Sequence, residues 1–230
     1  MTQALSRTDI QRPTPKYATP LKAIALGDSL IYGFGDVEGG GWVDRLRRQW
    51  MQDGPILYNL GVRGDTVRNV SQRLESEFRH RGELRHQVPD HIILSVGVND
   101  SARLGRPDGR NMTPFPEFQA RLADLLDRAN QLCPVTFVGM VPVNEAKMPF
   151  LDTFFFNHDD QHLFNEATRL ACQERQIPFL DLFDLWQQRG EAWCQQQMGD
   201  DGLHPNTHGY QTLLTDVLNW HPLQVISYSA

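Results

Sequence analysis

Short, mostly apolar segments recur along the chain and restrict its possible folds more than any other feature. They occupy residues 22–26, 55–60, 91–98, 135–141 and 178–182. A strand that is apolar along its whole length, rather than at every second position, is typical of a strand buried on both faces. Such strands occur mainly in parallel sheets that helices cover on both sides. We therefore predict a parallel sheet of five buried strands.

Longer amphipathic segments separate these strands. They occupy residues 41–51, 66–78, 116–132, 160–175 and 206–220. In the second segment Val67, Val70, Leu74 and Phe78 have the spacing of one face of a helix. Strands that alternate with helices indicate βα units. The predicted fold class is therefore α/β, a three-layer α/β/α arrangement with a flavodoxin-like, five-stranded parallel sheet.

The predicted elements fill most of the 230 residues without a linker, which favours one domain over residues 21–230. Residues 1–20 contain three prolines and no apolar run, and we expect them to form an extended tail. This tail lacks the apolar core of a secretory signal peptide, so we expect a cytoplasmic protein.

The charge balance excludes some classes of function. The chain has 22 Lys and Arg against 28 Asp and Glu, a net charge of −6, whereas nucleic-acid binders are usually basic. No apolar run approaches the roughly 20 residues of a membrane span. The spacing of Cys133, Cys172 and Cys194 fits neither a CxxC motif nor a zinc site, so we expect free thiols.

Small and polar residues follow the predicted strands. Gly27–Leu30 (GDSL) comes after the first strand, Gly61 after the second, and Gly97–Asp100 (GVND) lies at the end of the third. Residues 201–205 (DGLHP) come just before the last helix. Ligands of open α/β sheets bind outside the carboxyl ends of the strands. We therefore expect these four segments to form one site.

These residue types suit acyl transfer. A serine hydroxyl is a weak nucleophile that needs a neighbouring base, usually histidine, and an acid that orients the base. Ser29, His204 and Asp201 would fill these three roles. The reaction also needs hydrogen-bond donors for the developing oxyanion. We expect these to be the backbone N–H groups of Ser29 and Gly61 and the side-chain amide of Asn99.

With these motifs the chain resembles the SGNH hydrolases, also called GDSL-type esterases or lipases. The resemblance rests on the GDSL segment, Gly61, the GVND segment and the DGLHP segment, in the order that the family has them, and spans about residues 22–220. It implies a serine esterase that forms a covalent acyl-enzyme and needs neither cofactor nor metal. The family includes lipases, thioesterases and carbohydrate acetylesterases, so the resemblance implies a small-molecule ester but not which one.

Two other functions fit the sequence less well. The α/β-hydrolase signature GxSxG is absent around Ser29, where the sequence is GDSLI. The remaining alternative is a small-molecule or carbohydrate-binding protein with weak catalysis on the same fold. The presence of Ser29, Asp201 and His204 argues against it, because a binding protein does not need these three residues. The apolar segment 148–156 is open to three interpretations: an acyl pocket, a lid or a subunit contact. The oligomeric state is not indicated.

Overall fold

The computed structural model describes residues 21–53, 55–81 and 88–228, so the predicted tail over residues 1–20 lies outside the described part. The main sheet consists of β1 (Lys22–Gly27), β2 (Ile56–Gly61), β3 (His91–Ser95), β5 (Val135–Val138) and β7 (Phe179–Leu180). Its strand order is β2-β1-β3-β5-β7, and every neighbouring pair is parallel. The predicted five-stranded parallel sheet is therefore confirmed.

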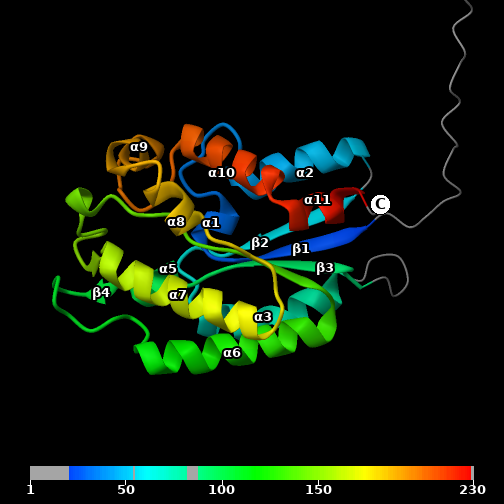
Figure 1. The fold of residues 1–230 in the computed structure, drawn as a ribbon, viewed down its shortest axis with the longest axis horizontal. Helices are drawn as coiled ribbons and strands as arrows, with labels where there is room; N and C mark the ends of the chain where they lie inside the picture. The colour runs from blue at the N-terminus through cyan, green and yellow to red at the C-terminus, as the bar shows by residue number, and fades with distance from the viewer. Residues whose placement is uncertain (1–20, 54, 82–87, 229–230) are drawn as a thin grey trace, which may run out of the picture.

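Helices cover both faces of this sheet (Figure 1). One layer contains α3 (Val67–His80), α6 (Phe115–Leu132) and α7 (His158–Glu174). The other contains α2 (Gly41–Asp53), α10 (Thr207–Asn219) and α11 (His221–Tyr228). None of the helices within the described residues is both long enough and apolar enough to cross a membrane.

The central strand β1 shows why the sheet is buried on both sides. Ile24 and Leu26 pack into the core beneath α3 and α6, whereas Ala23 and Ala25 point to the opposite face. All four side chains are completely buried. The small alanines leave room for large side chains of the second layer, such as Trp42 of α2. The continuous apolar pattern of residues 23–26 thus follows from two separate cores.

Several short elements lie between the main ones. They are α1 (Ser29–Tyr32), α5 (Val98–Ser101), β4 (Arg103–Leu104), η1 (Glu145–Lys147), β6 (Phe154–Phe155), α8 (Leu182–Gln187) and α9 (Glu191–Gln197). The predicted strand 91–98 ends at Ser95, because Gly97 has a φ of +130° and the chain then enters α5. β4 and β6 pair in antiparallel fashion beyond the main sheet. Of these short elements, α1, α5 and β6 carry residues of the site described below.

Candidate active site

Ser29 is the first residue of α1, directly after the carboxyl end of β1. The preceding Asp28 caps this short helix, because its carboxylate accepts the N–H of Leu30 at 2.9 Å. Gly27 is required here, since a Cβ atom would lie 1.9 Å from the carbonyl oxygen of Ser95. As the first helical residue, Ser29 has a backbone N–H without an intrahelical acceptor. The GDSL segment thus presents a hydroxyl and a backbone donor from one residue.

The Ser29 hydroxyl begins a line of three hydrogen-bonded side chains. Its Oγ lies 2.8 Å from Nε2 of His204, and Nδ1 of His204 lies 2.7 Å from Oδ2 of Asp201. Ser29 and His204 are only 3% and 4% exposed. When the ring proton is on Nδ1, His204 donates to the Asp201 carboxylate, and its Nε2 can accept the Ser29 hydroxyl proton. Residues 175 positions apart in the sequence are therefore in direct contact.

The loop over residues 199–205 fixes the carboxylate and the imidazole. Gly202 has a φ of +70°, which allows the tight turn between Asp201 and His204. Burial opposes ionisation of Asp201, but hydrogen bonds from the ring and backbone of His204 and from the N–H of Leu203 outweigh it and hold the pKa of Asp201 below its usual value. Asp201 therefore remains a carboxylate at neutral pH and can stabilise a protonated His204.

Asn99 reaches the same pocket from α5. Its Nδ2 donates one hydrogen bond to the backbone carbonyl of Asp65 at 2.9 Å. A primary amide carries two N–H groups, so the second remains for a ligand beside Ser29. Asp65 is in turn bound by Arg73, whose Nε lies 2.8 Å from its carboxylate and whose Nη2 donates to the carbonyl of Gly27 at 2.9 Å. Arg73 thus connects Asp65, which holds the Asn99 amide, to the turn that precedes Ser29.

Gly61 does not lie with the other predicted site residues. Its N–H donates to Oδ1 of Asn59 at 3.1 Å, and it borders a different pocket, together with Tyr32 and Asp36. A Cβ at position 61 would lie 2.1 Å from the backbone nitrogen of Tyr32, so the glycine allows α1 to pack against β2.

Gly64, which the sequence reasoning missed, lines the pocket beside Ser29 and Asn99. Its φ of +80° suits glycine, and a Cβ there would meet no atom within 4 Å. Its position in the loop between the predicted strand at 55–60 and the predicted helix at 66–78 could have indicated this role, because such loops lie at the carboxyl ends of the strands. The backbone of Gly64, rather than that of Gly61, faces the site.

Two buried carboxyl groups flank site residues in the sequence: Asp28 precedes Ser29, and Asp100 follows Asn99. Burial raises the pKa of Asp28 to about 7. Burial also raises the pKa of Asp100 to about 6, although hydrogen bonds from the Thr113 hydroxyl and the Val67 N–H partly offset it. Asp28 caps the helix that begins at Ser29, and Asp100, the neighbour of Asn99, accepts hydrogen bonds from α3 and from Thr113, so both have supporting roles.

The raised pKa of Asp28 predicts a pH-dependent stability. A carboxyl group that holds its proton more tightly in the folded state stabilises the protein fully below its unfolded pKa, and this contribution is lost as pH rises to about 7. We therefore expect Asp28→Asn, which keeps the oxygen that caps α1, to reduce the fall in Tm between pH 5 and pH 8. At pH 8 the free energy of unfolding of the variant should exceed that of the wild type by an amount on the order of a few kcal/mol. Thermal unfolding at several pH values tests this, with the exposed Asp108→Asn as control. Parallel Tm curves for wild type and Asp28→Asn would contradict it.

A pocket of about 380 Å³ opens in front of Ser29. Besides Ser29, Asn99, Gly64 and His204, its lining is mainly apolar and comprises Met112, Phe150, Leu151, Phe154, Phe156 and Leu203, with Arg63 at its edge. The ring of Phe34 packs edge-on against His204 at 4.6 Å, and the guanidinium of Arg63 stacks 3.8 Å above Phe34. The segment 148–156 therefore supplies much of the apolar wall. An apolar wall beside a hydroxyl nucleophile suits the carbon chain of an ester.

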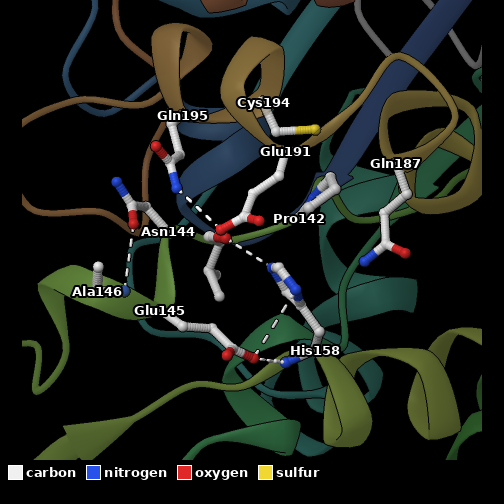
Figure 2. Close-up of a pocket in the computed structure, with 10 residues that line it drawn as sticks. Pro142, Asn144, Glu145, Ala146, His158, Gln187, Glu191, Cys194 and Gln195 are labelled. Carbon is white, nitrogen blue, oxygen red and sulfur yellow. Dashed lines mark hydrogen bonds and ion pairs between the residues drawn. The ribbon is translucent and has the colours of Figure 1, made fainter.

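A second pocket, of about 340 Å³, shares no lining residue with the first. Figure 2 shows Glu191 and Gln195 of α9 facing Glu145 and His158 across it. Residues of one wall are bonded to each other: Nε2 of His158 binds the carbonyl of Val143 at 2.8 Å, and Glu145 accepts the backbone N–H of His158. Within the described residues no group of three or more His, Cys, Asp or Glu side chains is placed to hold a metal ion. The hydrogen-bonded serine, histidine and carboxylate described above are not part of this second pocket.

Comparison with known proteins shows which family the chain belongs to. The model of the GDSL-like Lipase/Acylhydrolase family matches residues 25–212, which include Ser29, Asn99 and His204. The chain belongs to this family. Membership supports ester hydrolysis as the general type of reaction.

Individual relatives are distant in sequence. A GDSL esterase/lipase of Arabidopsis thaliana is 24% identical over 214 residues, covering 86% of this chain and 80% of its own. The lipase/acylhydrolase from Enterococcus faecalis has a TM-score of 0.68 at 19% identity and covers 86% of this chain and 93% of its own. A catalytic mutant of an acetylxylan esterase from Geobacillus stearothermophilus has a TM-score of 0.66 at 16% identity, with coverage of 89% and 95%. The two structures confirm the three-layer α/β/α fold.

Proposed function

We propose that this member of the family is a serine esterase that cleaves carboxylic esters through a covalent acyl-enzyme. The observation that carries the proposal is the hydrogen-bonded line from Ser29 through His204 to Asp201 at the mouth of a mainly apolar pocket. The same three residue types perform acyl transfer on several unrelated folds, where geometry and not sequence position defines their roles.

The reaction would run in two halves. In the first, Nε2 of His204 takes the hydroxyl proton as Ser29 Oγ attacks the ester carbonyl, and then gives that proton to the leaving alcohol. This leaves the acyl group on Ser29. In the second half, His204 takes a proton from water, the resulting hydroxide attacks the acyl carbonyl, and the proton returns to Ser29 Oγ as the acid leaves. Asp201 keeps Nδ1 protonated and stabilises the imidazolium in both halves.

We further propose that the oxyanion is bound by three donors: the N–H of Ser29, the N–H of Gly64 and the Asn99 amide. Gly64 replaces Gly61 in this proposal, because Gly61 borders another pocket and its N–H is bonded to Asn59. Two backbone donors and one side-chain amide form the usual set for a tetrahedral intermediate.

A fluorophosphonate probe tests the proposal directly. It forms a covalent bond only with a serine that a neighbouring base activates, so we expect stoichiometric labelling of the folded protein at Ser29, located by peptide mass spectrometry. Labelling should disappear in His204→Ala, which removes the base but leaves the serine. Prior unfolding of the protein is the control and should also abolish labelling. A folded protein that takes up no probe at Ser29 would rule out the esterase mechanism and favour a binding protein on the same fold.

A further inference from the structure

The turn between Phe150 and Phe154 holds an apolar residue in a disfavoured backbone conformation. Leu151 has a φ of +50° and the next residue, Asp152, a φ of +56°. Left-handed backbone is rare for residues other than glycine and asparagine, and tight turns with two such positions normally contain those two residues. Among the described residues, Leu151 is the only apolar residue other than glycine with a positive φ.

The rest of the protein holds this turn in place. Phe150 and Phe154 exchange backbone hydrogen bonds of 2.8 and 2.9 Å across it. Phe154 and Phe155 then pair with β4, and the buried side chain of Phe156 anchors the end of the segment in the core. The turn is therefore held at its base, and its tip cannot relax independently.

Burial does not explain why the tip carries leucine. The Leu151 side chain is 69% exposed, so within this chain it gains little from removal of its apolar surface from water. A glycine or asparagine would suit the backbone better and lose little packing. Leucine is unfavourable here both because its backbone is left-handed and because its apolar side chain is exposed to water. This combination indicates a function, because backbone strain is concentrated at ligand sites.

The position of Leu151 identifies that function. Its side chain lines the same pocket as Ser29 and His204, next to Phe150 and Phe154. An acyl chain bound in this pocket would cover the exposed leucine, and the apolar surface removed from water would grow with the length of the chain. An acetyl group has only one methyl carbon beyond the reacting carbonyl and would remove little of the Leu151 surface from water.

We propose that Leu151 is a specificity-determining residue whose side chain packs against the aliphatic acyl chain of the substrate, so that the preferred esters carry chains longer than acetyl. The proposal rests on the esterase function proposed above and assigns the acyl side of the substrate to the wall formed by residues 150–156. It selects the acyl-pocket interpretation of this segment over a lid or a subunit contact.

The experiment compares p-nitrophenyl acetate with p-nitrophenyl octanoate. We expect the wild type to have the higher kcat/KM for octanoate. Leu151→Asn should lower kcat/KM for octanoate about tenfold and change that for acetate less than about twofold. Because asparagine tolerates the left-handed backbone, the same variant should raise Tm. The matched control is Gln176→Asn, since the exposed Gln176 has a similar φ of +56° far from the pocket. It should raise Tm and leave both rates unchanged.

A second variant keeps the test decisive. Leu151→Ala removes the side chain but keeps an unfavourable left-handed residue, so it should lose the octanoate preference without gaining stability. An unchanged ratio of octanoate to acetate rates in both variants would overturn the role of Leu151 while the esterase function stands. A wild type that prefers acetate, or variants that change only the oligomeric state, would also overturn it. A wild type that cleaves neither ester and takes up no fluorophosphonate would remove the esterase function and this inference together.

Discussion

Ser29→Ala is expected to lower kcat for p-nitrophenyl ester hydrolysis by roughly 10⁴-fold or more. The variant lacks the only oxygen that His204 Nε2 contacts in the line of three side chains, so no acyl-enzyme can form. Oxyanion donors and substrate binding would remain and give a small residual rate. Initial rates measured with substrate well above KM, combined with loss of fluorophosphonate labelling, test this expectation.

The fold should survive this change, which makes the result easy to interpret. Ser29 is buried, but alanine fits the same space, and the capping bond that the Leu30 N–H donates to Asp28 stays. Ser76→Ala on α3 is a suitable control, because Ser76 is also a helical serine but is exposed and lies outside the pocket. Wild-type rates in Ser29→Ala would show that another group is the nucleophile.

The main elements of the fold were predictable from the sequence because burial dictates them. Residues 22–26 are apolar at each position except Lys22, since β1 lies between two helix layers, and residues 66–78 show the one-sided pattern of a helix on the sheet surface. The four-residue helices α1 and α5 were not predictable in this way. They are shorter than the window in which a helical period can be recognised, and tertiary contacts and caps define them.

The site was partly predictable for a related reason. Ser29 and Asn99 lie at the ends of parallel strands, which must share one edge of the sheet, and Asp201 and His204 are joined by a single turn. Gly61 shows the limit of this reasoning. A glycine indicates that the backbone approaches another group closely, but the sequence does not show which group. At position 61 this group is α1, because an added Cβ would lie 2.1 Å from the backbone nitrogen of Tyr32. Gly64, in contrast, borders the pocket. The pairing of β4 with β6, which places Phe154 beside the pocket, likewise depends on contacts between segments about 50 residues apart.

Asn99→Ala is expected to lower kcat about 10²- to 10³-fold with little change in KM. One N–H of the amide is used by the Asp65 carbonyl, and the other is the proposed donor to the oxyanion. A donor that acts on the charge developing in the transition state contributes mainly to kcat, because the neutral ester carbonyl binds it only weakly. Steady-state kinetics with one p-nitrophenyl ester over a range of concentrations separates the two parameters.

The bond to Asp65 makes a second explanation testable in the same experiment. Asn99→Ala also frees the loop that carries Gly64, so a loss of activity can arise from a displaced loop instead of a missing donor. Asn111→Ala is the matched control, because the amide of Asn111 binds the carbonyl of Ser101 at 2.8 Å in the neighbouring segment but does not line the pocket. A displaced loop would widen the pocket and raise KM, whereas loss of the donor would leave KM and Tm close to those of Asn111→Ala. If Asn99→Ala raises KM and lowers Tm relative to Asn111→Ala, the role of Asn99 is to hold the loop, and the oxyanion must be bound by the backbone of Ser29 and Gly64 alone.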